Sequence, residues 1–372
     1  MDSRSLSENR LPNLDRNRYQ GCSGFQGAWL VKGRAWVNLP IKTLVGGGVV
    51  LFLLAWSALS AGAGETLAHI KSRGSLRCGV SEGIVGFSAR DASGRWTGLD
   101  ADFCRAVAAA ALGGADRVSF VALRASARFP ALQLGHIDLL ARNTTWTLER
   151  EATLRVQFAG IIFYDGQGFM VPASSDVTAV AQLQDTTVCV VKGTTHERNL
   201  ADYFGLRKQR VKPLIIDSSV GVVAAFFAGQ CKSYTSDVSQ LAAARVRAPA
   251  GQAFRILPEQ ISKEPLGPVV RQGDDEWLTL VRWVLFALIA AEENRIKPDS
   301  ALKPSGDLKS DAGAQISKAL GVDPGWSRRA VQSVGDYGEI FERNVGKHSP
   351  LKLERGLNRL WTEGGLMYAP PW

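Results

Sequence analysis

Short apolar runs alternate with helical stretches from Glu65 onward, a pattern typical of an α/β protein built in layers. The pattern predicts strands at residues 76–80, 118–123, 137–141, 168–174, 187–191 and 211–216 and around Ser233-Tyr234.

Helices are expected between these runs. The pattern predicts helices at residues 66–73, 101–114, 129–134, 220–228 and 277–290, with two more starting at Thr147 and at His196. Asp100 is the predicted N-cap of the second helix, which should end at Gly113-Gly114. The helix at 277–290 is nearly all apolar, and fourteen residues are too few to span a bilayer. It is therefore predicted to be buried.

With 372 residues, the chain is longer than one hydrophobic core usually supports. A strand in the stretch PLGPVVRQGD (265–274) is expected to return to the first unit, so that unit is interrupted by a second lobe. The predicted parts are a leader at 1–63, lobe 1 at 64–169 and 268–295, lobe 2 at 170–267, and a C-terminal extension on lobe 1 at 296–372.

The first 63 residues resemble an export signal. A basic leader precedes the apolar run LVGGGVVLFLLAWSALSAGA, which ends in small residues at position 63. Twenty apolar residues can also anchor a protein in a membrane. Gly46, Gly47 and Gly48 weaken that helix, so we expect cleavage after about Ala63, while the anchor remains the alternative.

Charge and cysteine content narrow the class of protein further. Residues 1–43 hold seven Lys and Arg against three acids, so they carry +4 of the net charge of +9, and no basic stripe remains to indicate nucleic-acid binding. Cys22 lies in the leader, and four cysteines follow it. Local pairs, each within one lobe, are favoured over four free thiols. These pairs are Cys78 with Cys104 and Cys189 with Cys231.

Two loops offer groups that bind anions. Asn143, Thr144 and Thr145 follow a strand, and Arg150 lies near the start of the next helix, on a turn that can point back to the loop. Thr194 and Thr195 precede another helix start. An Arg fork with hydroxyl groups suits a carboxylate. From spacing alone, simple helix capping is the favoured explanation of both loops.

Two further residues complete the candidate site. Asp237 follows the strand SYTS and can accept an ammonium group, although a cap is the commoner role of such an Asp. Phe87, in the turn after the first strand, can face an apolar part of a ligand or belong to the core. The four histidines are too dispersed to predict a metal site, and we expect no catalytic residue, metal or cofactor because no nucleophile elbow, phosphate loop or H-E-x-x-H motif occurs.

Longer stretches of the chain resemble a known family. They include LRCGVSEGIVGFSARDASGRWTGLDADFCRAV, HIDLLARNTTWTLER, VCVVKGTTHERNLADYF, YTSD and ISKEPLGPVVRQGDDEW, and YGEIFERN and SPLKLERGLNRLW in the extension. From Gly64 to the end, the chain resembles the general L-amino-acid-binding periplasmic proteins of ABC importers. That resemblance implies a type II periplasmic binding fold, with two lobes joined by a two-strand hinge. The leader matches nothing in this family.

The resemblance also implies roles for single residues. Asn143, Thr145 and Arg150 match the loop that holds the α-carboxylate, and Thr194 and Thr195 match the loop that closes onto it. Asp237 matches the acid that takes the α-ammonium, and Phe87 the aromatic residue beside the ligand side chain. The four cysteines also lie where this family has them, which supports the local pairing. His196 stands where the family varies, so it is expected either to touch the ligand or to face solvent.

The expected function is that of a periplasmic, monomeric receptor. It would bind free L-amino acids of several kinds and deliver them to an inner-membrane ABC permease. It is not expected to be an enzyme. Two alternatives remain: a dehydratase of the same fold acting on a prephenate-like acid, and a sensing ectodomain. The absence of a signalling domain after Trp372 counts against the second alternative.

Overall fold

A computed structural model describes residues 64–296 and 311–371. The predicted leader, with its apolar run and cleavage point, lies outside the described residues, as does the first part of the predicted extension. Within the described residues, no helix combines the length and the apolar character needed to cross a membrane.

The first sheet contains five strands from two separate parts of the chain. Their spatial order is β4 (Val118–Ala122), β1 (Leu76–Val80), β5 (Leu139–Leu140), β14 (Val269–Arg271) and β6 (Val156–Phe158). β1 pairs in parallel with β4 and β5, whereas β14 runs antiparallel to β5 and β6. The chain therefore does return to this sheet near residue 270, after a long excursion.

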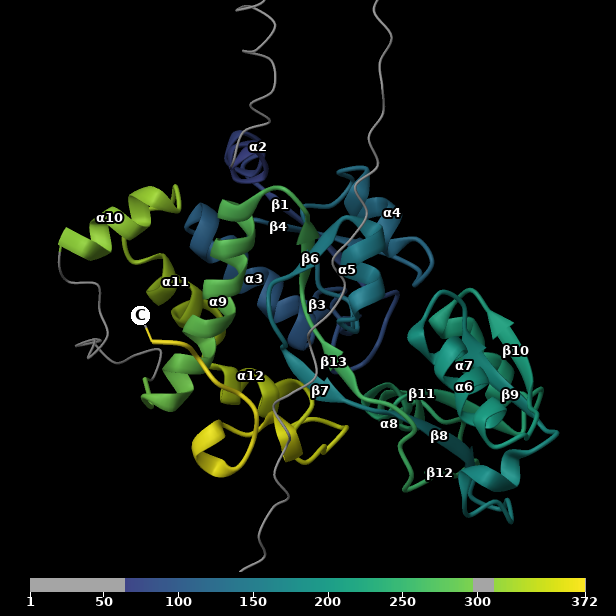
Figure 1. Cartoon of the computed structure of the whole chain (residues 1–372). Helices are drawn as coiled ribbons and strands as arrows, with labels where there is room; N and C mark the ends of the chain where they lie inside the picture. Colours follow the sequence, from purple (N-terminus) through teal and green to yellow (C-terminus); the bar gives the residue numbers. More distant parts are fainter. Residues whose placement is uncertain (1–63, 297–310, 372) are drawn as a thin grey trace, which may run out of the picture. The chain divides into compact units, whose positions relative to one another are not determined.

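The excursion forms a second five-stranded sheet. Its order is β10 (Lys212–Ile216), β9 (Thr187–Val191), β11 (Ser233–Asp237), β8 (Gln167–Pro172) and β12 (Phe254–Ile256). β9 is parallel to β10 and β11, and β8 is antiparallel to β11 and β12. Between the two sheets run β7 (Phe163–Asp165) and β13 (Glu264–Leu266), which pair antiparallel and lie side by side in Figure 1.

Helices connect the strands of both sheets. Those of the first sheet are α2 (Glu65–Arg73), α3 (Leu99–Leu112), α4 (Arg128–Gln133), α5 (Leu148–Leu154) and α9 (Asp275–Glu293). Those of the second are η2 (Val180–Leu183), α6 (Thr195–Leu206), α7 (Ser219–Phe227) and α8 (Val238–Val246). A small hairpin of β2 (Ala89–Arg90) and β3 (Trp96–Thr97) precedes α3.

The start of α3 differs from the prediction. Its N-cap is Gly98, and Asp100 lies inside the first turn, so the N-cap assignment of Asp100 is wrong. Gly98 has φ of 123°, and a Cβ there would lie only 2.2 Å from the carbonyl oxygen of Phe87. Close approach of two backbones therefore requires glycine at this point, and it overrides the preference of Asp for the cap.

The C-terminal part of the chain packs on the helices of the first sheet. It comprises α10 (Asp311–Ala319), α11 (Trp326–Val334), α12 (Tyr337–Asn344) and the short turns η3 (Gly356–Asn358) and η4 (Trp361–Glu363). α11 packs against α3 and α9. α3 presents a run of buried alanines from position 108 to 111, and such small side chains allow a close helix approach.

Asn358 attaches this C-terminal part to strand β7. In the pair of β7 and β13, Tyr164 lies opposite Pro265. Proline has no N–H, so it donates no backbone hydrogen bond to Tyr164. The side-chain oxygen of Asn358 accepts the N–H of Tyr164 at 2.7 Å, and its side-chain nitrogen donates to the carbonyl of Tyr164 at 3.0 Å. One buried amide thus satisfies both outward-facing backbone groups of the strand.

Two disulfides join the cysteines in the local pairs that the sequence favours. Cys78 in β1 is bonded to Cys104 in α3, and Cys189 in β9 is bonded to Cys231 just before β11. The pairs are 26 and 42 residues apart in sequence. Each bond therefore holds a helix or loop to the strand beside it.

Removing the second disulfide should destabilise the protein. We expect the double variant Cys189→Ser and Cys231→Ser to lose about 2–4 kcal/mol of unfolding free energy, since the bond restricts the unfolded chain over a long loop. Urea denaturation followed by circular dichroism measures the difference. The variant without Cys78 and Cys104 should lose slightly less, because its loop is shorter. Unchanged midpoints in both variants would contradict the expectation.

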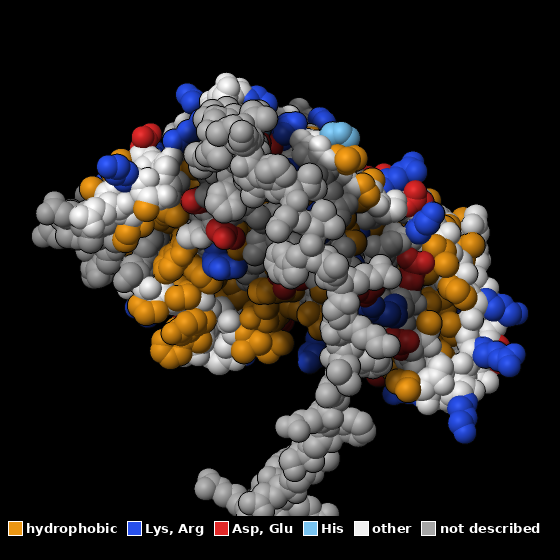
Figure 2. Space-filling model, turned by 45° about the horizontal axis from the view of Figure 1, so that its top comes forward, with side chains coloured by type: hydrophobic (Ala, Val, Ile, Leu, Met, Phe, Trp, Pro, Cys, Tyr) orange, Lys and Arg blue, Asp and Glu red, His pale blue; other side chains and the backbone are white. Residues whose placement is uncertain are grey.

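Charged side chains are mixed on the visible surface. On the face shown in Figure 2, basic side chains lie among acidic and apolar ones and form no continuous stripe.

Candidate functional site

The first side of the site is the loop after β5. Asn143 has a left-handed φ of 39°, and its N–H donates to the carboxylate of Asp100 at 3.2 Å. Thr147 caps α5 by accepting the N–H of Arg150 at 3.2 Å. The guanidinium of Arg150 turns back and donates to the carbonyl of Thr145 at 2.6 Å. The loop and the first turn of α5 are therefore one connected unit.

The second side lies at the carboxyl ends of β9 and β11. Because neighbouring parallel strands end at the same edge of a sheet, the residues after them lie close together. Thr194, Thr195 and His196 begin α6 after β9, and Asp237 ends β11. The hydroxyl of Thr194 donates to the carbonyl of Val191 at 2.7 Å and makes no capping hydrogen bond, so simple capping does not explain it.

The two sides meet around one small cavity. Thr145 and Thr195 face each other with their hydroxyl oxygens 3.4 Å apart, and both donate to the same carboxylate oxygen of Glu264, at 2.5 and 2.9 Å. The cavity lining includes Asn143, Thr145, Arg150, Thr194, Thr195 and His196. Its volume is about 10 Å³, roughly that of a single water position. A larger ligand therefore requires the two sides to separate.

Asp237 lies just behind this cavity. Its carboxylate is 1% exposed, and it accepts hydrogen bonds from His196 Nε2 at 2.9 Å and from Gln240 Nε2 at 2.5 Å. Both partners line the cavity. Burial alone would lower the pKa of His196, but the carboxylates of Asp237 and Glu264 outweigh it and the pKa is raised. The imidazole of His196 is thus the present partner of Asp237.

Three buried guanidinium groups border the cavity. Sequence patterns single out Arg150 alone, whereas the structure adds Arg128 and Arg142. Burial lowers the pKa of Arg142 and of Arg150 to about 10 and that of Arg128 as well. Arg128 donates to the carbonyl of Ala125 at 2.7 Å, and its Nε has no hydrogen-bond partner. The site is therefore rich in cationic groups suited to a carboxylate.

Glu264 is the other residue that the patterns miss. It belongs to crossover strand β13, and it accepts hydrogen bonds from both sides of the site, including one from Asn199 at 2.8 Å. No local spacing distinguishes this Glu from a surface residue. Only its place in a strand between the sheets gives it this role.

Phe87 lies apart from the other predicted residues. Its side chain is 1% exposed, and its ring packs edge-on against Phe163 with the centroids 5.3 Å apart. Phe163 in turn stacks on Phe341 of α12. Phe87 does not belong to the cavity lining, so the core alternative describes its surroundings and we leave it out of the proposed site.

One cluster in the described part of the chain has the spacing of a metal site. His196, Asp237 and Glu264 each place a ligand atom within 4.8 Å of the others, although the histidines are dispersed in sequence. The carboxylate oxygens involved already accept hydrogen bonds from Thr145, His196 and Gln240. Both carboxylates thus belong to hydrogen-bonded networks within the protein.

Asp100 gives the site a distinctive pH dependence. Burial raises its pKa to about 7, against the lowering effect of the Asn143 N–H and of Arg142. The folded protein then keeps a proton that the unfolded chain, with a carboxyl pKa of about 3.9, has lost. The free energy of unfolding should therefore fall as the pH rises from about 4 to 7.

The variant Asp100→Asn should reduce this fall, because an amide has no proton to lose and still accepts the Asn143 N–H. Thermal melts between pH 4 and 8 measure the slope. Asp165 in β7, whose pKa burial and the nearby Asp237 raise to about 8, adds a slope of the same sign in both proteins. The exposed Asp116→Asn is the matched control and should keep the wild-type slope.

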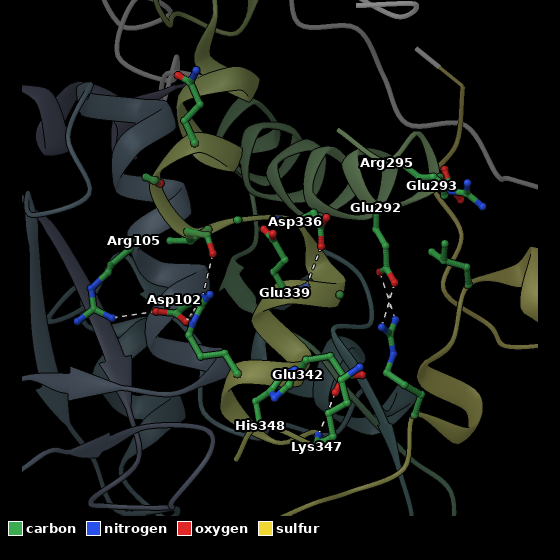
Figure 3. Close-up of a pocket in the computed structure, with 18 of the residues that line it drawn as sticks. Asp102, Arg105, Glu292, Glu293, Arg295, Asp336, Glu339, Glu342, Lys347 and His348 are labelled. Carbon is green, nitrogen blue, oxygen red and sulfur yellow. Dashed lines mark hydrogen bonds and ion pairs between the residues drawn. The ribbon is translucent and has the colours of Figure 1, made fainter. Parts of the chain in front are cut away.

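A much larger hollow of about 1350 Å³ lies between the C-terminal part and α3 and α9. Figure 3 shows that its charged side chains face one another. Asp102 accepts hydrogen bonds from Arg105 and Arg343, and Glu292 pairs with Arg355 at 2.9 Å. These charged side chains already have protein partners, and their ion pairs join two parts of the chain. At these positions the hollow therefore offers no unpaired charge to a ligand.

Comparison with known proteins places this site in a family. Residues 76–297 match the bacterial extracellular solute-binding proteins, family 3. The general L-amino acid-binding periplasmic protein AapJ of Rhizobium johnstonii is 46% identical over 320 residues, which cover 84% of this chain and 94% of that protein. The glutamate/glutamine/aspartate/asparagine-binding protein BztA of Rhodobacter capsulatus is 44% identical over 337 residues, covering 89% and 99%.

A solved structure agrees with these relatives. The ABC transporter periplasmic binding protein from Brucella ovis with glutathione bound is 43% identical, has a TM-score of 0.77, and covers 82% of this chain and 98% of its own. The family match alone spans more than half of the chain. The protein therefore belongs to the bacterial extracellular solute-binding proteins of family 3 and has the type II periplasmic binding fold.

Proposed function

We propose that this protein is the extracytoplasmic solute-binding component of an ABC importer for L-amino acids, with broad specificity. The observation that carries the proposal is the meeting of opposite charges at one interlobe cavity. Arg150 lies on its wall with Asn143, Thr145, Thr194 and Thr195, and Asp237 lies just behind it. A free amino acid presents the complementary pair of charges on two groups attached to the same carbon atom. The names of AapJ and BztA support this ligand class.

The proposed binding mode uses both lobes. Asn143, Thr145 and Arg150 hold the α-carboxylate from lobe 1, and Thr194 and Thr195 close onto it from lobe 2. The α-ammonium takes the place of the His196 imidazole beside Asp237. Both contacts form fully only in the closed state, so ligand binding shifts the equilibrium toward closure. An analogue that lacks either charge leaves a buried protein charge unpaired and should bind poorly.

The proposed organisation of the chain gives each lobe one of the two sheets, with the first boundary inside β8. Lobe 1 comprises residues 64–169 and 268–295, lobe 2 comprises 170–267, and residues 296–372 form an extension on lobe 1. The pairing of β7 with β13 supports a two-strand hinge between these lobes. Residues 1–63 are proposed to be a leader that directs export to the periplasm, where the protein acts as a monomer and docks on the inner-membrane permease.

We also infer that the protein performs no chemistry on its ligand. Its relatives are named as binding proteins, and its family is one of solute-binding proteins. The one buried acid and base pair at the cleft, His196 with Asp237, has a simpler role as the ligand-free substitute for the ammonium contact.

A thermal-shift screen tests the proposal. The purified protein, freed of bound ligand, is mixed with each of the twenty L-amino acids and with sugars, polyamines and prephenate. A ligand that binds the folded state raises the melting temperature by mass action. Stabilisation by several L-amino acids is the expected result. Silence with every amino acid would refute the proposed ligand class, and turnover of prephenate would show an enzyme.

A further inference from the structure

Helix α7 is apolar on two faces. Its residues Val222, Ala225 and Phe226 are buried in the core of the second lobe. A second set repeats at the spacing of one helix face. This set consists of Val220, Val223, Ala224 and Phe227. Val220 is 51% exposed, and Val223 and Phe227 are only partly buried against the core, so this face is incompletely covered.

That second face forms one wall of a side chamber. Its lining also includes Ile84 and Val85 of the loop after β1, together with Tyr234 and Ala243. The chamber has a volume of about 220 Å³, which exceeds the roughly 150 Å³ that suffices to hold a benzene ring in a protein. An isopropyl, isobutyl or phenyl group therefore fits within it.

The side chamber adjoins the polar cavity. Ser219 and Gln240 line both spaces. The Gln240 amide also donates to Asp237, the proposed ammonium partner. A group attached to the α-carbon of a ligand held at Asp237 thus passes between these two side chains. The one charged residue of the wall, Arg247, donates to the carbonyl of Gly83 at 3.0 Å and is already engaged there.

We propose that the side chamber receives the side chain of the bound L-amino acid and favours branched aliphatic and aromatic groups. This inference rests on the proposed function and specifies its ligands. Burial of each additional methylene group strengthens binding by about fourfold. Leucine and phenylalanine should therefore bind at least 10-fold more tightly than alanine.

The variant Ala224→Phe tests the chamber by filling it. Isothermal titration with L-alanine, L-leucine and L-phenylalanine compares it with the wild type and with Ala201→Phe, the same change on an exposed position of α6. We expect Ala224→Phe to weaken leucine and phenylalanine binding more than 10-fold and alanine binding less than threefold. The Ala201→Phe control should match the wild type for all three ligands.

The outcomes separate the two proposals. Equal affinities for alanine and leucine in the wild type, or an equal loss for all ligands in Ala224→Phe, would overturn the side chamber and leave the receptor function standing. Binding of no amino acid by the wild type would overturn the function itself. If Ala224→Phe does not fold, Val223→Thr, which replaces a methyl group by a hydroxyl at nearly constant volume, should still weaken leucine binding selectively.

Discussion

A protein in which Asp237 is replaced by Asn will bind its preferred L-amino acid at least 100-fold more weakly than the wild type. The carboxylate is almost wholly buried, and an amide of the same shape leaves the ligand ammonium without an opposite charge. Breaking a buried ion pair from one side costs about 3–5 kcal/mol. Each 1.4 kcal/mol is tenfold in affinity. Titration calorimetry with the ligand found in the screen measures the loss.

The fold of this variant should survive, because an amide side chain can still accept the Gln240 N–H that the carboxylate accepts. Asp176→Asn is the matched control. Its carboxylate is exposed and forms a surface ion pair with Lys232 at 3.8 Å, an interaction worth little. A near wild-type affinity in Asp237→Asn, with a normal melt, would remove Asp237 from the proposed site.

The second large effect is expected for Arg150→Ala. Loss of this guanidinium removes the one that the proposed binding mode places on the ligand carboxylate, while Arg128 and Arg142 still border the cavity. We expect an affinity loss of about 100-fold. The affinity of Arg150→Lys should lie between those of the wild type and of Arg150→Ala, since an ammonium keeps the charge and loses the fork geometry. The exposed Arg245→Ala in the last turn of α8 is the control and should bind as the wild type does.

Together, the two variants test which end of the ligand each residue holds. Asp237 and Arg150 should act on opposite ends of the amino acid. A ligand analogue without the ammonium should lose no affinity in Asp237→Asn, because the buried carboxylate that it leaves unpaired is gone, and it should remain sensitive to Arg150→Ala. Equal sensitivity to both changes would contradict the assignment of ends.

Much of the fold can be predicted from local patterns. The strands β1 and β9 have the predicted bounds because each is a short apolar run between turn residues. The N-cap role of Thr147 follows from its place before a helical stretch. The start of α3 could not be predicted, because the contact that selects Gly98 comes from the backbone of Phe87, which local spacing does not reveal.

The site is predictable only where a motif places several polar groups in one loop. Thr145, Arg150 and Thr195 stand in such loops, and the structure brings them to one cavity. Arg128 and Glu264 come from a short helix and a crossover strand, and they reach the site only through long-range packing. Phe87 shows a different difficulty, since an aromatic residue after a strand has the same local pattern in a core and in a binding site.

The two hydrogen bonds between Asn358 and Tyr164 constrain the order in which parts of the protein can fold. Residues 167–256 supply every strand of the second sheet in one continuous stretch, so that unit can form as soon as it is synthesised. The outer edge of β7 stays unpaired until the side-chain amide of Asn358, 194 residues further along the chain, reaches it. Contacts of such separation close slowly. A chain truncated before residue 358 would hold an intact second lobe and an unprotected crossover strand, which is the edge that self-association uses.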